Sequence, residues 1–215
     1  YDPLRDFMPI GLFVRTPMVI AVHRSIPVQS VAELVAYSKA NPGKLGFGSS
    51  GIASTAHLSL EMFNAATGAG ITHIPYGSGG ALTPDLVSGT ISGAITEIST
   101  ALPLHREGNV RILAVAASAR LPQAPELPTA TEAGVAGYEA TIWLGLMAPT
   151  GTPKAVVDKL NEAVSKIASQ ADVKATWTKQ GAAPMVMNPT VFDKYMRDDI
   201  TKWAGVIKKA NIKLD

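Results

Sequence analysis

Short apolar runs alternate along the chain with stretches in which apolar residues recur at helical spacing. A run of four to eight such residues that ends in turn residues is typical of a strand. The Thr16-Pro17 pair separates the first two runs, so we expect two strands there. The predicted strands are residues 9–14, 18–23, 44–47, 71–74, 91–96, 110–117 and 140–148. Strands that alternate with helices predict an α/β fold with mostly parallel sheets.

Helix starts carry the usual capping signals. Ser30 and Glu33 form a capping box, and Pro153 and Pro189 each stand at the first position of a later helix. Further helices are predicted from about residue 55 to Gly68, over 81–88 and through 102–106. The last two helices have apolar stripes that we expect to be core, namely Val156, Val157, Leu160, Val164 and Ile167, and then Val191, Phe192, Tyr195, Met196, Trp203 and Ile207.

Residues 121–137 differ from the rest of the chain in their proline content. Pro122, Pro125 and Pro128 fall within this short stretch. Proline interrupts helices and removes a donor from sheet ladders. We therefore predict that this segment is the boundary between two lobes.

The composition is that of a globular protein with a hydrophobic core. Of 215 residues, 47% are hydrophobic and 17% charged, which excludes a disordered protein. A net charge of +2 gives no indication of nucleic acid as a partner. The absence of cysteine excludes disulfides, thiol catalysis and zinc–thiolate sites. The residues after Tyr1 are unlike a signal peptide, so we expect a processed or cut chain.

Residues 46–57 are the most informative segment, because a short strand stops there in glycines and serines and a helix follows at once. Free N–H groups at a helix start, beside hydroxyls, can hold an anion. The segment has no lysine or arginine, so neutral groups would have to bind it. Residues 76–80 repeat the same design after the next strand. Ligands of open α/β sheets bind at this end of the strands.

The segment allows three other interpretations. Gly46, Gly48 and Gly51 spell the dinucleotide pattern G-x-G-x-x-G. That fingerprint needs an acid at the end of the next strand, whereas the first acid after it here is Asp85. A nucleophile elbow needs glycines two positions before and after one serine, and no serine of the segment has both. A helix cap that binds nothing stays open.

No group of residues in the sequence indicates catalysis. The four histidines stand in separate elements, none of them is paired with another histidine at metal-ligand spacing, and we expect them to have surface or packing roles. Asp85 and Glu97 follow strands, but neither has an acid–base partner. We predict a ligand-binding protein that is not an enzyme and has no cofactor or metal. The alternative is a nucleotide-dependent α/β enzyme that uses Gly46, Gly48 and Gly51.

Motifs spread over the whole chain carry a family resemblance. They include Tyr1-Asp2-Pro3-Leu4-Arg5-Asp6-Phe7, Gly48-Ser49-Ser50-Gly51, His73-Ile74-Pro75-Tyr76, Ala101-Leu102-Pro103, Glu132-Ala133-Gly134, Gly151-Thr152-Pro153 and the ending Ile212-Lys213-Leu214-Asp215. Together they are similar to the Bug-type receptors, the extracytoplasmic solute-binding proteins of tripartite tricarboxylate transporters. The resemblance implies a two-lobed α/β fold of the type II periplasmic-binding-protein class.

The resemblance also implies where the lobes and the site lie. Domain 2 would span residues 18–138, and residues 1–17 and 139–215 would form the remainder of domain 1. The ligand would be a small organic carboxylate, such as a dicarboxylate or an aromatic acid, captured in the periplasm for a membrane permease. The residues expected to bind it are Ser49, Ser50, Gly51, Ser54, Tyr76, Gly77, Gly79, Thr96 and Trp143.

Two departures from the family pattern change this expectation. Family members begin with a further strand and a glycine-rich loop that supplies the other half of the ligand grip, so we expect the N-terminal part of domain 1 to be missing here. We expect such a chain to bind its ligand weakly and to self-associate. Members that bind amino acids carry an Asp after the strand that ends here at Thr96, so this chain favours a plain organic acid.

Overall fold

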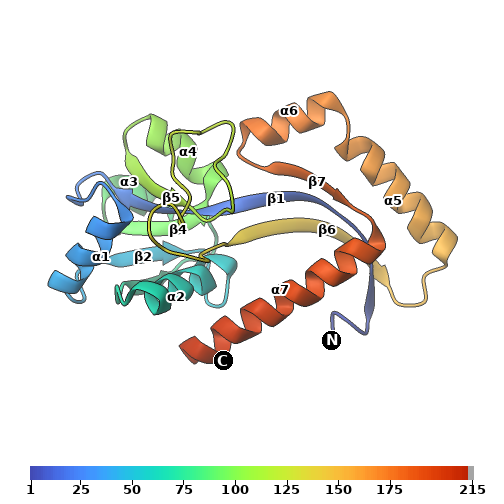
Figure 1. Cartoon of the computed structure of the whole chain (residues 1–215), viewed down its shortest axis with the longest axis horizontal. Coiled ribbons are helices and arrows are strands. Elements are labelled where there is room, and N and C mark those ends of the chain that lie inside the picture. The colour runs from blue at the N-terminus through green and yellow to red at the C-terminus, as the bar shows by residue number, and fades with distance from the viewer. Residues whose placement is uncertain (213–215) are drawn as a thin grey trace. The chain divides into compact units, whose positions relative to one another are not determined.

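The computed structural model describes residues 1–212, and their contacts divide them into two compact units. Unit 1 consists of Tyr1–Thr16 and Trp143–Gly205. Unit 2 consists of Pro17–Ile142 and the end of the chain from Val206. Residues 213–215 of the ending motif lie outside the described residues. Helices and strands alternate along the chain, as the α/β prediction requires (Figure 1).

Unit 2 is built on a sheet with the strand order β3-β2-β4-β1-β5. β3 (Thr72–Pro75) and β4 (Gly93–Glu97) both run parallel to β2 (Gly46–Ser49). β1 (Phe7–His23) inserts between β4 and β5 (Val110–Val115) and runs antiparallel to both. The expectation of mostly parallel sheets is therefore wrong, because the first strand of the chain enters the middle of a βαβ unit in the opposite direction.

Helices cover both faces of this sheet. α2 (Thr55–Thr67) contacts β2, β3 and β4, whereas α4 (Ile98–Arg106) contacts β4 and β5, and Figure 1 shows these helices on opposite sides. α3 (Thr83–Ser88) packs on the α4 side, where Leu82 and Leu86 are buried in one cluster with apolar residues of β4 and β5. The end of β2 is thus enclosed by α2 on one face and by α3 on the other.

The predicted helix caps of unit 2 are confirmed. α1 (Val31–Ala40) begins after Ser30, whose hydroxyl accepts the Glu33 N–H at 3.2 Å. The Glu33 carboxylate accepts the Gln29 N–H in return at 2.7 Å. α2 ends at Gly68, which has the left-handed conformation (φ 65°) of a helix C-cap.

β1 is a single strand of 17 residues, and the predicted break at Thr16-Pro17 is wrong. Its first part pairs with β7 (Ala183–Met187) as far as Arg15, and its second part pairs with β4 from Met18 onward. Pro17 lies between these two ladders. Proline is tolerated in a strand where no ladder needs its missing N–H, so the strand continues through it.

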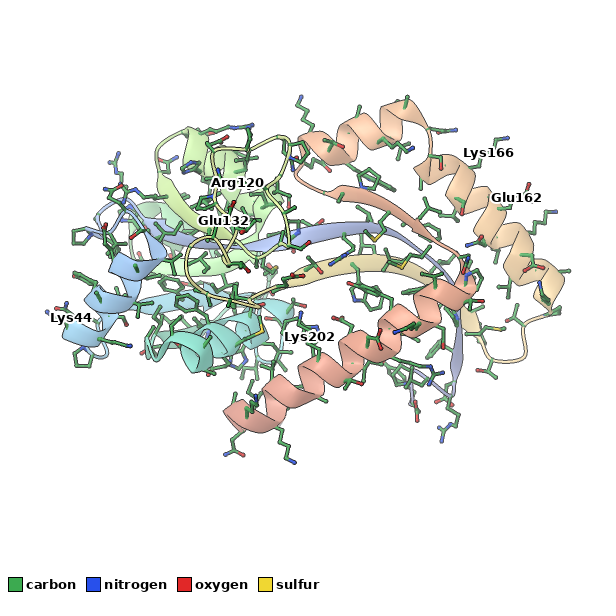
Figure 2. All side chains as sticks on the ribbon, in the orientation of Figure 1. Lys44, Arg120, Glu132, Glu162, Lys166 and Lys202 are labelled. Atoms are coloured by element: carbon green, nitrogen blue, oxygen red, sulfur yellow. The ribbon has the colours of Figure 1, made fainter. Side chains whose placement is uncertain are left out.

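The proline-rich segment 121–137 belongs to unit 2 and is not the boundary between the units. Its residues Leu121, Ala124 and Leu127 pack into a core cluster with α4 and β5. The loop is also tied at its surface, since Arg120 Nε donates to both carboxylate oxygens of Glu132 at 3.1 and 2.9 Å (Figure 2). The prolines exclude regular structure, and the apolar side chains between them still bury against the sheet.

In unit 1, both β7 and β6 (Thr141–Pro149) pair with β1. The helices are α5 (Lys154–Ala168), α6 (Ala171–Lys179) and α7 (Pro189–Ala210), of which the part from Val206 belongs to unit 2. The strand β7 and the helix α6 were not predicted, because Pro184 interrupts the apolar run of β7 and α6 has no buried residue. Of the helices among residues 1–212, none is apolar over a length that would cross a bilayer.

The apolar stripes of α5 and α7 are only partly buried. Val157, Phe192 and Met196 belong to the core of unit 1. Val156 and Ile167, however, are 45% and 52% exposed. Leu160, Val191 and Ile207 are exposed as well. The expectation that these stripes are core is therefore wrong for much of α5, because the elements of the described chain leave that face uncovered.

Gly93 of β4 lies where a side chain would collide with its neighbours. A Cβ there would stand 2.5 Å from the Ala21 carbonyl oxygen and 2.6 Å from Phe47 Cε1. We expect Gly93→Ala to lower the free energy of unfolding by about 1–3 kcal/mol, the usual cost of overpacking a core. In the control Gly205→Ala, the new Cβ meets nothing within 4 Å and alanine favours the helix, so stability should be equal or higher. Urea unfolding compares the two, and equal midpoints would contradict this packing.

Candidate ligand-binding site

The carboxyl ends of three parallel strands meet at one edge of unit 2. Gly48 of β2 pairs with Ile74 of β3 and with Ala94 of β4, so the strands end nearly in register. The predicted residues of this unit lie along that edge, with Ser49, Ser50, Gly51 and Ser54 at and after the end of β2, Tyr76, Gly77 and Gly79 after β3, and Thr96 near the end of β4. Ligands of open α/β sheets bind at this position.

The turn between β2 and α2, residues 50–54, contains two residues with positive φ. Gly51 has a φ of 129° and Ala53 a φ of 57°. Glycine adopts such values freely, whereas for alanine they cost roughly 1–2 kcal/mol. The Ser54 hydroxyl closes the turn, because it accepts the His57 N–H at 3.3 Å and donates to the Gly51 carbonyl at 2.7 Å. Beside this turn lie the N–H groups of the first helical turn, which a helix cannot satisfy internally.

The Ser49 side chain is fully buried and shapes the turn from inside. Its hydroxyl accepts the Gly51 N–H at 3.1 Å and lies 2.6 Å from Nε2 of His73. The Gly51 carbonyl oxygen is 3.1 Å from the same hydroxyl. Ser50 and Gly51 are half-buried and keep access to solvent. A ligand at this turn would therefore meet Ser50 and Gly51, while the hydroxyl of Ser49 supports them.

His57 of α2 and His73 of β3 stack beside the turn. Their ring centroids are 3.7 Å apart and their planes differ by 7°. His57 is buried, and its Nδ1 accepts the Ala53 N–H at 3.0 Å. Burial lowers the pKa of His57, and burial together with the neighbouring His57 ring lowers the pKa of His73 to about 4. Both rings are therefore neutral at pH 7.

Tyr76 connects the turns that follow β2 and β3. Its N–H donates to the Ser49 carbonyl at 3.0 Å, and its ring lies over Gly48, where a Cβ would come 3.4 Å from Tyr76 Cε2. The Tyr76 hydroxyl donates to Asp85 Oδ2 of α3 at 2.6 Å. This hydrogen bond raises the pKa of Tyr76 to about 12. Tyr76 is thus fixed at both ends on the α3 face of the sheet.

The other predicted residues of unit 2 lie at the same edge of the sheet, but they have no side-chain hydrogen bonds like those of Tyr76. A Cβ at Gly77 or Gly79 would meet no further atom within 4 Å, so the loop after β3 leaves open space. Thr96 is buried in β4 opposite Val19 of β1, and Glu97 after it is half-buried. These residues can form a wall of the site.

Trp143 belongs to unit 1, whereas the other predicted residues belong to unit 2. Its indole N–H donates to Asp199 Oδ2 at 2.8 Å. Its ring packs edge-on against Phe192 and Tyr195, with centroids 5.3 and 6.2 Å away. Its part in ligand binding stays a prediction.

Gly46 and Gly48 lie inside β2 and serve its packing. A side chain at Gly46 would collide with Ile74, and one at Gly48 would collide with Ile91. A dinucleotide fingerprint places its glycines in the turn itself, where they approach the pyrophosphate. The structure therefore removes the basis of the nucleotide alternative.

Two features of the site were not predicted, namely the stacked histidines and Asp85 as the partner of Tyr76. His73 pairs in register with Phe47, so its side chain lies on the same face of the sheet as those of Phe47 and Ser49. That alternation is the one sequence signal that could have placed His73 beside Ser49. Nothing in the spacing placed His57 against it.

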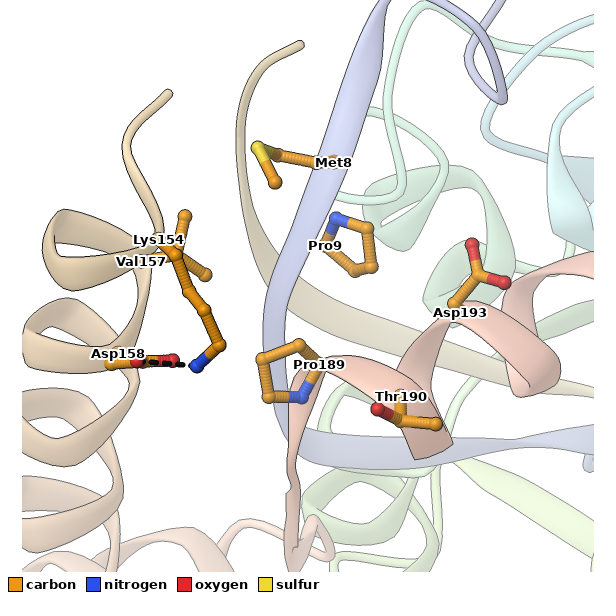
Figure 3. Close-up of a pocket in the computed structure, with 8 residues that line it drawn as sticks. All are labelled: Met8, Pro9, Lys154, Val157, Asp158, Pro189, Thr190 and Asp193. Carbon is orange, nitrogen blue, oxygen red and sulfur yellow. Dashed lines mark hydrogen bonds and ion pairs between the residues drawn. The ribbon is translucent and has the colours of Figure 1, made fainter. Parts of the chain in front are cut away.

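A pocket of about 540 Å³ lies within unit 1 and contains none of the predicted residues. Met8, Pro9, Lys154 and Asp158 are among the residues that line it (Figure 3). Lys154 Nζ and Asp158 Oδ2 pair at 2.6 Å, with side chains 87% and 54% exposed. Such exposed, mutually paired charges give the pocket little preference for a ligand. Among residues 1–212, no three metal-ligating side chains gather at one place.

The sequence matches the family described as the tripartite tricarboxylate transporter family receptor over residues 1–212. Protein BugT of Bordetella pertussis is 32% identical over 214 residues, which are 100% of this chain and 66% of BugT. The chain thus spans just under two thirds of the length of this relative.

Solved structures show the same fold. Rpa4515 of R. palustris with adipate has a TM-score of 0.91 at 36% identity, over 99% of this chain and 71% of that one. MatC from Rhodopseudomonas palustris with bound malate has a TM-score of 0.86 at 31% identity, over 96% and 71%. The periplasmic binding protein BugD has a TM-score of 0.90 at 31% identity, over 99% and 72%. These likenesses confirm the predicted periplasmic-binding-protein fold.

The Tyr76–Asp85 hydrogen bond is expected to appear in an alkaline titration. Because the pKa of Tyr76 is raised from 10.0 to about 12, its stabilisation is complete below pH 10 and is lost as the pH rises through 12. Ultraviolet absorbance of tyrosinate, taken as the difference between the wild type and Tyr76→Phe, isolates this phenol. Asp85→Ala should return its pKa toward 10.0. An unchanged titration in Asp85→Ala would show that the hydrogen bond is not formed.

Proposed function

Because the chain belongs to the tripartite tricarboxylate transporter receptor family, we propose that it captures a small organic carboxylate at the edge formed by β2, β3 and β4, without catalysis. The observation that carries the proposal is the turn at residues 50–54. It lies between the end of a parallel strand and the start of α2, with a positive-φ glycine and two serine hydroxyls beside the N–H groups of the first helical turn. Relatives with the same fold hold adipate and malate.

Ser50, Gly51 and the first turn of α2 are proposed to hold one carboxylate end of the ligand. Ser49 and Ser54 support them through the Gly51 hydrogen bonds. Residues 46–57 include no lysine or arginine, so the ligand charge would be balanced by neutral donors and the helix dipole. Donors of this kind recognise a carboxylate without regard to the rest of the molecule.

The strength of these donors sets the expected affinity. Each hydrogen bond to a charged group contributes about 1.5–3 kcal/mol net. Micromolar binding needs about 8 kcal/mol after the cost of association is met. About three or four donors at one turn therefore fall short of that value or barely reach it. We propose that this chain binds its ligand weakly through this turn.

The remainder of the site favours a plain organic acid. Thr96 ends the predicted strand after which family members that bind amino acids carry an Asp, and it is buried in β4. Glu97 is only half-buried at the start of α4, and it would have to turn inward to take that role. A dicarboxylate or an aromatic acid is the proposed ligand class.

We further propose a periplasmic location and delivery of the ligand to the membrane permease of a tripartite transporter. The family description and the periplasmic relative BugD support this assignment. The two lobes are proposed to be residues 18–138 and residues 1–17 with 139–215. Two bounds of the compact units, at 16/17 and 142/143, lie close to these positions, whereas the contacts place the chain from Val206 in unit 2.

Dicarboxylates should stabilise the protein, and nucleotides should not. For a dissociation constant of about 1 mM, 10 mM adipate or malate adds about 1.4 kcal/mol to the free energy of unfolding. We expect Gly51→Ala to abolish this gain, because it alters the turn at a φ of 129°. Gly70→Ala is the matched control, since Gly70 also has a positive φ (65°) and a Cβ there meets nothing within 4 Å. Thermal unfolding of the wild type and of both variants, with and without ligand, measures this gain.

A shift with NAD or ATP, and none with any dicarboxylate, would refute the proposal.

The exposed apolar side chains of unit 1 are expected to cause self-association of this chain. Leu144 is 63% exposed on β6 and Ile167 52% exposed on α5. Apolar groups of this kind, beside unpaired strand edges, favour contacts between molecules. Leu144→Ser with Ile167→Ser should shift the sedimentation coefficient toward that of a monomer. Ile52→Ser, which removes a 59% exposed side chain from unit 2, should leave association unchanged. A wild type that is monomeric at every concentration excludes this behaviour.

A further inference from the structure

The two positive-φ residues of the turn are each linked to a different histidine of the stacked pair. The Gly51 N–H donates to the Ser49 hydroxyl, and that hydroxyl contacts His73. The Ala53 N–H donates directly to His57. The turn at residues 50–54 is therefore connected at its two positive-φ positions to one pair of rings.

The hydrogen bonds around Gly51 bear on the protonation state and the tautomer of His73. The Gly51 carbonyl already accepts from the Ser54 hydroxyl at 2.7 Å and from the Ser54 N–H at 3.3 Å, which uses its two lone pairs. The Ser49 hydroxyl can also donate to that carbonyl at 3.1 Å, but His73 Nε2 is nearer at 2.6 Å, and we assign the Ser49 proton to it. Nε2 must then be unprotonated, so His73 is neutral and carries its hydrogen on Nδ1.

The hydrogen bond from Ala53 determines the tautomer of His57, because it allows only one direction of donation. A backbone N–H can only donate, so His57 Nδ1 is the acceptor at 3.0 Å and its ring hydrogen is on Nε2. Glu61 Oε1 lies 3.9 Å from that Nε2, which is too long for a hydrogen bond. Because the ring is neutral, this contact is not an ion pair at neutral pH. The two rings therefore carry opposite tautomers.

We propose that His57 and His73 are positioning residues whose neutral, stacked pair sets the conformation of the carboxylate-binding turn. This role rests on the proposed function of that turn. Neither ring is assigned a contact with the ligand. Each accepts a hydrogen bond that fixes one positive-φ residue, His73 through the Ser49 hydroxyl and His57 directly. With both acceptors in place, the turn is formed before the ligand arrives, which lowers the cost of binding.

The arrangement is sensitive to acid. A proton on His57 Nδ1 would face the Ala53 N–H, which can only donate, and would break that hydrogen bond. A proton on His73 Nε2 would make the Ser49 hydroxyl the acceptor and turn its own hydrogen toward the Gly51 carbonyl at 3.1 Å. Two charged rings 3.7 Å apart would also repel each other, with Glu61 as the nearby carboxylate. Because the pKa of His73 is lowered from 6.5 to about 4, the unfolded chain binds more protons in that interval. Stability is therefore complete above pH 6.5 and falls as the pH drops toward 4.

Matched substitutions separate the acceptor role from simple packing. His73→Gln and His57→Asn keep an acceptor near the positions of Nε2 and Nδ1 but cannot be protonated at these pH values. His73→Leu and His57→Leu fill the space without an acceptor. At pH 7.5 we expect the Leu variants to bind adipate about tenfold more weakly, the loss of one hydrogen bond, and the Gln and Asn variants to bind as the wild type does. Equal affinity of the Leu and the polar variants would overturn the proposal.

Nuclear magnetic resonance gives a test that does not depend on the ligand. Imidazole ¹⁵N shifts of the wild type at pH 7.5 should show His57 with its hydrogen on Nε2 and His73 with its hydrogen on Nδ1. Amide signals of Gly51 and Ala53 should move in the Leu variants and stay in place in His73→Gln and His57→Asn. In the wild type these amides should lose protection from exchange between pH 6.5 and 4, and in the polar variants they should keep it.

The outcomes distinguish this proposal from the function on which it rests. If adipate and malate do not bind but the tautomers and amide signals are as expected, the pair positions the turn and the ligand class is wrong. If the rings show the reversed tautomers or are protonated at pH 7.5, the positioning role is wrong whatever binds. Should the Leu variants fail to fold, the wild-type tautomers and the acid response of the polar variants still decide.

Discussion

The parallel pairing of β2 with β3 and β4 is the constraint on which the site depends. Because Gly48 pairs with both Ile74 and Ala94, the three strands end together and their following turns meet at one edge. Residues from three separate parts of the chain become neighbours through backbone hydrogen bonds alone. The antiparallel β1 does not disturb this arrangement, since it lies on the far side of β4. The site is a product of strand register more than of any single motif.

The turn after β2 is fixed from both faces of the sheet. On the α2 face, the buried Ser49 hydroxyl joins Gly51 to His73. On the α3 face, the Tyr76 ring covers Gly48 and its hydroxyl is held by Asp85. A buried polar group is costly unless it is paired, so these contacts restrict the turn to few conformations. A turn that is rigid before binding loses less entropy when the ligand arrives.

The sequence predicted what local chemistry determines. The Ser30–Glu33 box and the end of α2 at Gly68 follow from capping preferences, and the turn at residues 50–54 follows from its glycine and serines. The continuity of β1 through Pro17 was not predictable, because it depends on which strands pair on either side of that residue. The exposure of the apolar stripe on α5 was not predictable either, because the spacing of its apolar residues is the same as in a helix face that is buried. The His57–His73 stack joins two elements and has no local signal at all.

The absence of a charged side chain at the turn limits how strongly this turn can bind its ligand by itself. A lysine or arginine at the turn would attract an anion strongly even at one isolated surface. Neutral donors at a single turn contribute too little for tight binding, so high affinity requires that a second surface add its contacts. Neutral histidines fit this scheme because they accept hydrogen bonds from the turn and add no charge to it. The turn can therefore select for a carboxylate, while the strength of binding depends on the further contacts that the ligand makes.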